Sequence, residues 1–422
     1  MEKLKNFTNI QFLFLSIIIF LPIFLTLGIA VAEILLFFFT LYGIYKTFKE
    51  KKFYLIKNKE IIFLFIFSIY IAINSIFNNI NIDKTSSIFF FRHVLLVISI
   101  IYIFEKCFIK HQKVTKFLYL FFIIIFIDSL IQFFLGKNIL GYETINNRVS
   151  SFFGDDLILG SFLILFFPIT LIFFFDKKEL LFKDIFFGFY FFTVLLSGER
   201  RAFIILLLSI LFIIIFSKEV RKLIFKSLII FISLVIICSF IFKGTYDPLN
   251  RIFVKTYNET IKYDEKNKIN NDNILDNKKK IIIFSYEHTH HYQLAINLIK
   301  QKPIFGHGPK GFRDYCRGVN YDSEFGLCTT HPHHLLLQII VELGLIGLIF
   351  YLFAALYVIK NFINLLKFDN KSNISVILMT LVLINIFIPL VPSGNFFNNR
   401  NAMLCFYSIG LYLYFFKFSV RR

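Results

Sequence analysis

The sequence predicts an all-α polytopic membrane protein. Hydrophobic residues occupy 57% of its 422 positions, and long windows such as residues 7–32 carry no charged side chain. A soluble domain of this size has too little interior to bury so much apolar surface. We therefore expect about twelve transmembrane helices and one large periplasmic loop that contains short helices.

The helices are predicted from apolar windows of about 17–25 residues, the length that crosses a bilayer. The windows lie near 10–27, 28–45, 61–77, 88–104, 116–135, 158–175, 184–197, 202–216, 225–242, 334–359, 374–392 and 402–418. Helices 1–9 thus occupy residues 1–242, the loop occupies 243–333, and helices 10–12 occupy 334–422, as one integrated membrane domain. The first window has no small-residue cleavage site, so we expect a helix rather than a signal peptide.

The distribution of Lys and Arg predicts the orientation. Most basic residues of the short connections lie in alternate connections, beginning with the N-terminus. By the positive-inside rule both termini then face the cytoplasm. Long loops cross regardless of charge, so the loop 243–333 is expected outside. The net charge of +19 is consequently a topology signal beside membrane lipid, and no nucleic-acid partner is expected.

The loop contains three kinds of segment. Residues 262–280 are polar and Asn/Lys-rich without periodicity, which predicts a solvated connection. Residues 287–300 place apolar side chains three and four apart, which predicts an amphipathic helix against the outer membrane face. Residues 306–311 match the dinucleotide pattern GxGxxG, but no βαβ unit surrounds them, so we reject nucleotide binding.

Two of the five cysteines, Cys316 and Cys328, lie in this loop. An even number of cysteines in an oxidising compartment predicts a disulfide between them, and two free thiols are the alternative. We expect Cys107, Cys238 and Cys405 to be ordinary membrane or edge residues.

Polar residues inside the apolar windows all fall in the outer half of their predicted helices. They are Glu33, Asn74, Arg92, His93, Asp128, Gln132, Gln338, Glu342 and Asn385. Such residues normally face a wet cavity or a partner, because charge in lipid is costly. This one-sided distribution predicts a single cavity that opens toward the periplasm.

Arginines on the outward side run against the positive-inside trend. Arg148, Arg200, Arg201 and Arg400 lie in outward loops or at their edges. A guanidinium keeps its charge and holds two phosphate oxygens at once, so these positions predict phosphate binding. The alternative is that Arg200 and Arg201 only extend to the membrane interface.

Three histidines, His331, His333 and His334, stand where the loop enters the tenth helix. One interpretation is a general base, since imidazole titrates near neutral pH. A second is a metal site shared with His288, His290 or His291, although neither cluster has an established zinc spacing. The third is helix capping and packing.

Glu342 does not orient His333 directly. Nine residues along a helix place it on the opposite face, roughly 13 Å further on. His334, Gln338 and Glu342 are spaced by four, so we expect them to share one face.

At these positions the chain resembles the O-antigen ligase and polymerase family of bacterial membrane glycosyltransferases, over roughly residues 140–410. The most specific likeness is His333 followed by Gly344-x-x-Gly347. The resemblance implies that His333 is the catalytic base. The turn Ser197-Gly198-Glu199-Arg200 is similar to the family's Ser/Thr-Gly-x-Arg, which implies that Arg200 contacts a lipid diphosphate.

Two other segments carry weaker likeness, and two positions depart from the family. Residues 148–153 are similar to Arg-x-Ser-Gly-x-Phe, with Ser151 in place of the glycine, and residues 303–308 match Pro-x-x-Gly-x-Gly. His334 stands where the family usually carries Asn, Ser or Gln. His288 stands where a loop arginine is expected, so either a protonated His288 or Arg313 or Arg317 supplies that charge.

The resemblance implies transfer of a glycan from undecaprenyl diphosphate to an acceptor hydroxyl, on a glycan or on lipid A core, at the periplasmic face of the inner membrane. No metal or other cofactor is expected. Besides His333, the expected substrate-contacting residues are Arg148, Arg200, Arg201, His288, Arg313, His331 and His334. Ligase, polymerase and protein O-glycan transferase stay open. A transporter of the same lipid is the rival, and it would place polar groups in both leaflets.

Overall fold

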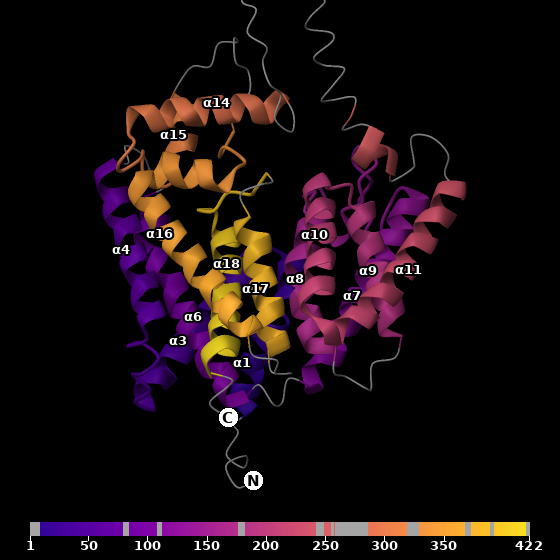
Figure 1. The fold of residues 1–422 in the computed structure, drawn as a ribbon, viewed down its shortest axis with the longest axis horizontal. Helices are drawn as coiled ribbons and strands as arrows, with labels where there is room; N and C mark the ends of the chain where they lie inside the picture. The colour runs from indigo at the N-terminus through magenta and orange to yellow at the C-terminus, as the bar shows by residue number, and fades with distance from the viewer. Residues whose placement is uncertain are drawn as a thin grey trace, which may run out of the picture.

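The computed structural model is helical throughout most of its length (Figure 1). It describes residues 9–78, 84–107, 112–175, 182–241, 249–254, 257, 286–318, 329–367, 373–388 and 392–418. These residues contain two isolated β-bridges, Lys137 with Glu143 and Ile145 with Arg148, and no β-strand. The all-α prediction is therefore right. The polar stretch 262–280 lies outside the described residues.

Each of the twelve apolar windows contains a helix. The first holds α1 (Asn9–Ile19) and α2 (Leu21–Leu27), which are bent by 66° where Pro22 starts the second helix. The others are α3 (Ile29–Lys49), α4 (Lys59–Asn78), α6 (Arg92–Cys107), α7 (Gln112–Leu135), α8 (Leu159–Phe174), α9 (Lys183–Leu196), α10 (Arg200–Phe216), α11 (Lys218–Ile241), α16 (Leu335–Leu366), α17 (Asn373–Phe387) and α18 (Asn399–Leu413). Short elements are α5 (Lys84–Ile88), η2 (Phe89–Phe91), η4 (Ser151–Phe153), η5 (Asn250–Val254) and η7 (Tyr414–Phe418).

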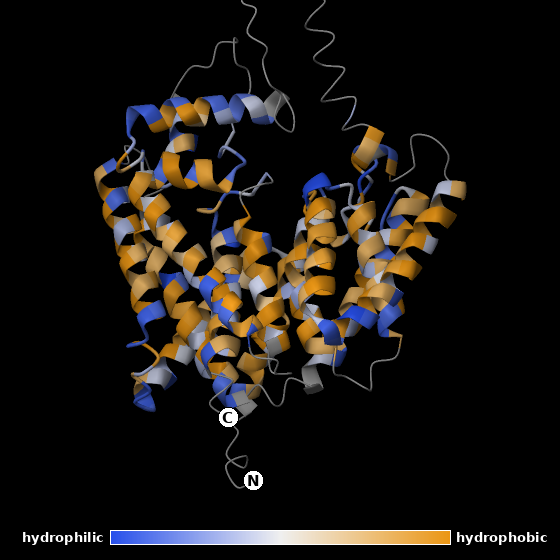
Figure 2. Cartoon of the chain, viewed as in Figure 1, coloured by the Kyte–Doolittle hydropathy of each residue, from blue (hydrophilic) through white to orange (hydrophobic). Residues whose placement is uncertain are grey.

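Within the described residues, six helices are long and apolar enough to cross a membrane, or seven if α1 and α2 form one bent span. These six are α3, α4, residues 86–106, α7, α11 and α16, whereas α8 and most of α17 are apolar but shorter. Hydrophobic residues dominate the middle of the bundle, and hydrophilic residues concentrate toward its ends and on α14 (Tyr286–Gln301) (Figure 2). The protein is thus a helical membrane protein, and the number twelve stays a prediction.

The predicted amphipathic helix exists as α14, but its apolar side contacts protein. Ala295 and Leu298 are buried against Phe312 of α15 (Gly311–Gly318) and Val341 of α16. The position of α14 against the outer membrane face stays a prediction. Full burial of an apolar side chain of this size contributes about 1.5–3 kcal/mol, so the contact holds α14 and α15 over the start of α16.

One end of the bundle gathers the elements that carry the predicted site. Figure 1 shows α14, α15 and the first turns of α10 and α16 at this end, whereas α18 and η7 finish at the opposite end. The histidines before α16 and the arginines at the start of α10 therefore lie on the same side of the molecule.

Candidate active site

His334 caps α16. Its backbone is extended, and its ring Nδ1 accepts a hydrogen bond from the Leu337 amide at 3.4 Å. The first amides of a helix have no partner within it, so a side-chain acceptor at this position stabilises the helix start. The capping interpretation is thus right for His334.

His331 anchors the segment to residues 392–398. Its Nε2 lies 3.1 Å from the carbonyl of Ser393, and its Nδ1 lies 3.0 Å from the Thr330 hydroxyl. A carbonyl only accepts, so Nε2 carries the hydrogen and Nδ1 accepts from Thr330. Burial lowers the pKa of His331 to about 4. The ring is therefore neutral, and both nitrogens are engaged inside the protein.

His333 differs from both neighbours. The structure gives its half-buried ring no hydrogen bond to any described residue, while its carbonyl accepts from the Ser393 amide at 2.8 Å. Its φ of 53° lies in the left-handed region, which costs a residue with a side chain roughly 1–3 kcal/mol and is concentrated at functional sites. Burial, followed by the neighbouring His331, His288 and His291, lowers the pKa of His333 to about 3. At physiological pH its ring is therefore neutral.

Helix α14 brings two more imidazoles to this ring. The ring centroids of His288 and His291 lie 5.5 and 5.4 Å from that of His333, and His331 lies 4.0 Å from it. We call His288, His291, His331 and His333 the histidine cluster. Tyr292 adds an edge-on contact with the His334 ring at 5.5 Å. Thus the residue at the position of the family's loop arginine, His288, lies beside His333.

The cluster gives the metal interpretation no support. Among the described residues, no group of three or more His, Cys, Asp or Glu side chains is arranged to hold a metal ion. His290 is also buried on α14.

The predicted face of Gln338 and Glu342 exists, and both residues are fully buried. The Gln338 amide donates to Asn395 Oδ1 at 2.7 Å and to Glu342 Oε2 at 3.3 Å, and its oxygen accepts from the Phe396 amide at 3.0 Å. Gln338 therefore joins α16 to residues 392–398, close to the Ser393 anchor. The polar Ser-Gly-Asn signal of this segment was present in the sequence, but the segment was not assigned to the site.

Other polar residues of the apolar windows likewise bind neighbouring segments. Asn74 donates to the carbonyl of Phe305 at 2.5 Å, Arg92 to Asn399 at 2.8 Å, and Ser209 to Asn385 at 3.1 Å. Asp128 accepts from Ser151 at 2.6 Å, and the oxygen of Gln132 accepts from the Ser150 and Ser151 amides at 2.9 and 2.7 Å. The expectation of a common wet cavity is thus unnecessary for these residues.

Helix α16 is broken at Gly344, and the 303–308 turn docks into the break. Gly344 has φ 67° and ψ −164°, and a Cβ there would lie 2.1 Å from the Ile304 carbonyl oxygen. A Cβ on Gly306 would lie 2.6 Å from the backbone of Glu342 and Gly344. Only glycine permits this approach, so the two glycine motifs of the sequence form one structural unit. The part of α16 after the break, residues 345–366, is still long enough to cross a bilayer.

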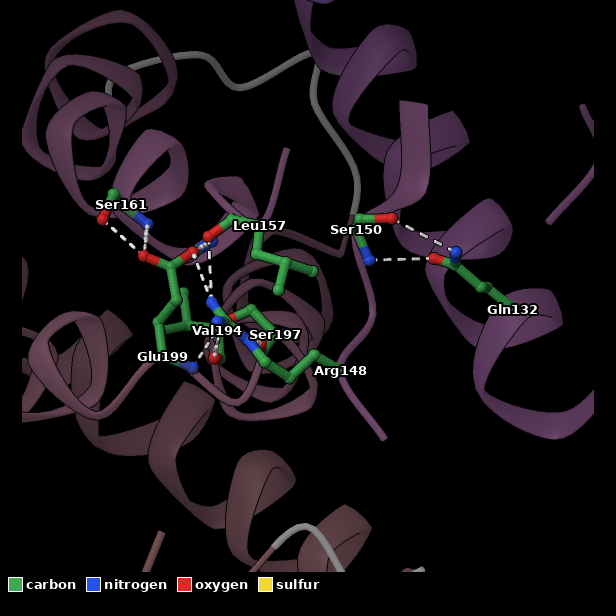
Figure 3. A network of polar contacts seen from close by, with 9 residues as sticks. Gln132, Arg148, Ser150, Leu157, Ser161, Val194, Ser197 and Glu199 are labelled. Carbon is green, nitrogen blue, oxygen red and sulfur yellow. Dashed lines mark hydrogen bonds and ion pairs between the residues drawn. The ribbon is translucent and has the colours of Figure 1, made fainter. Parts of the chain in front are cut away.

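Arg148 extends toward Leu157, Ser197 and Glu199 (Figure 3). Its Nε donates to the Ser197 carbonyl at 3.1 Å, and its Nη2 donates to the Leu157 carbonyl at 2.9 Å and lies 3.9 Å from Glu199. Burial lowers the pKa of Arg148, and the Glu199 carboxylate opposes that shift. The guanidinium is thus committed to holding the turn before α10.

Glu199 joins that turn to the start of α8 (Figure 3). Its carboxylate accepts from the Gly160 amide at 2.7 Å and from the amide and hydroxyl of Ser161 at 3.2 and 2.5 Å. A negative charge at a helix N-terminus is favourable because the free amides point toward it. Burial nevertheless raises the pKa of Glu199, with Ser161 and Arg148 opposing the rise.

The turn presents Arg200 and Arg201 as the first residues of α10, both half-buried. Arg201 has a buried Nε without a hydrogen-bond partner among the described residues. Arg313 is half-buried and Arg317 is exposed on α15. Arg400 lies over the Phe153 ring, with its guanidinium carbon 5.7 Å from the ring centroid. These positions carry the positive charge at the end of the bundle where the histidine cluster lies.

The cysteines follow the prediction in part. Cys316 is disulfide-bonded, and its predicted partner Cys328 lies outside the described residues. Cys238 and Cys405 are buried and do not form disulfides.

Residues 185–352 match the family model described as O-antigen ligase. This part of the chain belongs to the O-antigen ligase family. The match includes the Arg200 turn, α14, His333 and Gly344, and it leaves out α4, Arg148 and residues 392–398. No curated protein matches the chain. The match confirms the resemblance derived from the motifs. Members of the O-antigen ligase family are membrane glycosyltransferases, either ligases or polymerases.

Proposed function

We propose that the chain transfers a glycan from an undecaprenyl-diphosphate carrier to an acceptor hydroxyl at the periplasmic face of the inner membrane. The observation that carries the proposal is the contrast among the three loop histidines. His331 and His334 use ring nitrogens inside the protein, whereas the neutral, half-buried His333 ring makes no hydrogen bond to the described residues. It is the ring best suited to take a proton from a bound hydroxyl.

The reaction needs one bond to form and one to break at the anomeric carbon. The acceptor oxygen attacks this carbon while His333 takes the hydroxyl proton, and the bond between the carbon and the diphosphate oxygen breaks. The leaving diphosphate keeps the electron pair of that bond as negative charge. Cationic groups near it lower the barrier by electrostatic stabilisation.

Arg200 and Arg201 are the proposed principal contacts of the diphosphate, with Arg313 and His288 approaching from the loop. Arg200 and Arg201 lie within the segment that matches the family model, and His288 lies 5.5 Å from His333 between ring centroids. Arg148, His331 and His334 serve chiefly by holding the turn and the histidine segment in place. The polyprenyl tail lies against apolar helices in the bilayer.

The test is carrier-linked glycan accumulation in cells whose only copy carries His333→Asn or Arg200→Ala. We expect both variants, at normal abundance, to accumulate the carrier-linked glycan and to lose the transferred product. Arg221→Ala is the control, since Arg221 lies in α11 and its guanidinium donates to the Ile215 carbonyl at 3.4 Å. Carrier consumption at the wild-type level in both site variants would overturn the mechanism.

The form of the product separates the activities within the family. If the chain is a ligase, its deletion leaves no glycan on the acceptor. If it is a polymerase, deletion leaves single repeats attached. A purified protein that moves the carrier across vesicles without changing it chemically would instead favour a transporter.

We also propose that both termini face the cytoplasm and that the segment bearing α14 faces the periplasm, as the Lys and Arg distribution predicts. Reporter fusions at the termini and within residues 262–280 test this orientation. A cytoplasmic signal from the loop fusion would contradict it.

A further inference from the structure

The break in α16 frees backbone groups that α4 and the 303–308 turn satisfy. A helix interrupted at Gly344 loses the bonds that would link residues on its two sides. Each of five freed groups has an outside partner: the carbonyls of Val341, Glu342 and Leu343 accept from His307 N, Gly308 N and Tyr70 Oη at 2.8, 2.9 and 2.6 Å, and the amides of Leu345 and Ile346 donate to the carbonyls of Pro303 and Ile304 at 2.9 and 3.4 Å.

The side chains of Tyr70 and Asn74 of α4 bind both the break and the turn. Tyr70 donates to the Leu343 carbonyl and accepts from the Asn74 amide at 3.2 Å. The same Asn74 amide donates to the Phe305 carbonyl at 2.5 Å. The Tyr70 ring also stacks on Phe350, beyond the break, at 5.8 Å between centroids. Tyr70 and Asn74 are four residues apart, so they share one face of α4.

The turn that Tyr70 and Asn74 contact lies, along the chain, between the two segments that carry the histidine cluster. α14, which carries His288 and His291, ends two residues before Pro303, and α16 begins two residues after His333. The seat of the 303–308 turn in the break therefore sets where α14 lies relative to the start of α16. Neither Tyr70 nor Asn74 lies within the matched family segment.

We propose that Tyr70 and Asn74 are positioning residues of the active site. They fix the turn in the α16 break and thereby hold the α14 histidines at the correct distance from His333. The inference rests on the proposed function, because positioning has meaning only for a site that uses His333. A small displacement of reacting groups is costly: about 1 Å lowers a rate by roughly 100-fold.

The experiment compares Tyr70→Phe and Asn74→Ala with Tyr351→Phe in the full-length protein. Tyr351 is a matched control, because it lies in α16 and its hydroxyl donates to the Phe387 carbonyl at 2.8 Å, away from the break. Glycan transfer is measured with carrier-linked glycan extracted from a strain that lacks the enzyme, using membranes of that strain as acceptor. Amide hydrogen exchange is followed in peptides covering residues 303–308 and 341–346.

We expect kcat to fall by about 10- to 100-fold in both α4 variants, with the KM for the carrier-linked glycan within about twofold of wild type. Exchange should speed up in both peptides, and Tyr351→Phe should change neither quantity. The inference is overturned if the α4 variants have the wild-type kcat per folded molecule. It is also overturned if their lower total activity is fully explained by a smaller amount of folded protein. His333→Asn in the same assay separates the two proposals: its full activity refutes the proposed function, whereas an inactive His333→Asn beside active α4 variants refutes only the positioning role.

Discussion

The histidine cluster and the arginine turn, residues 197–201 with Arg148, are held by contacts of very different reach. The turn is fixed by bonds across 49 positions to Arg148 and 39 to Gly160. The segments around the cluster are fixed by bonds across 57, 231 and 273 positions, from Gln338, Asn74 and Tyr70. Bonds to nearby loop and helix segments thus fix the turn, whereas the position of the cluster depends on packing between helices that are far apart in the sequence.

The two regions also use their polar side chains differently. In the turn, Arg148 and Glu199 are committed to each other and to backbone groups. At the start of α16, His331 and His334 likewise bind groups inside the protein, whereas the His333 ring makes no hydrogen bond to the described residues. Residue type therefore does not identify the substrate-contacting group. We infer that group from which side-chain nitrogens already form hydrogen bonds inside the protein.

Gly344→Ala should have the largest effect. A Cβ there meets backbone at 2.1 Å and keeps a positive φ, so we expect a loss of about 4 kcal/mol or more in the free energy of unfolding. Gly141→Ala, near the other region, has a φ of 89° but open space around the new Cβ. It should cost about 1–2 kcal/mol. Thermal unfolding in detergent measures both, and equal losses would show that the break is not tightly filled.

Glu199→Gln should have the next effect. Removing the buried carboxylate leaves Arg148 without its counter-charge and weakens the bonds to α8, so we expect a loss of about 2–4 kcal/mol. The control is Glu143→Gln, since Glu143 forms a shorter but exposed ion pair with Lys137 at 2.9 Å. That change should cost less than about 1 kcal/mol. If both variants unfold at the same temperature, burial does not strengthen the Arg148–Glu199 ion pair.

Acidification should have the smallest effect near neutral pH. The pKa of His333, about 3, lies below its ordinary value of about 6.5, so kcat/KM should stay constant from pH 8 to below 6 and fall only toward pH 4. The pKa values of His331 and His333 are lower in the folded protein than in the unfolded chain, so their neutral rings favour folding above about pH 6.5. This stability is lost as the pH falls through the pKa values of the folded protein. A midpoint of the kcat/KM profile near pH 6.5 would contradict the low pKa of His333.

The sequence predicted the helices well because apolar windows and turn residues are local signals. All twelve windows contain helices, and the α14 periodicity marked a true helix. The periodicity did not reveal that Phe312 and Val341 contact the apolar side of this helix.

The sequence singled out residues that lie together in the structure, but it predicted fewer of the contacts that they make. The spacing of His333 and Gly344 singled out the segment that meets α14 in the structure, and the outward arginines singled out the turn before α10. That Arg148 binds the Leu157 carbonyl, or that the 303–308 turn fills the break at Gly344, depends on contacts between distant segments. No local pattern joins Tyr70 to Leu343, so α4 stayed outside the predicted site.

The most direct measurement places one substitution at two neighbouring positions: glycan transfer by His333→Asn and by His334→Asn. Asparagine tolerates the left-handed backbone of residue 333 and caps a helix well at residue 334. Both variants should therefore fold. We predict that His333→Asn loses about 100-fold or more in kcat, as removal of a general base does, while His334→Asn stays within about threefold of wild type. Full activity of His333→Asn, or equal loss in both variants, would contradict the assignment of His333 as the base.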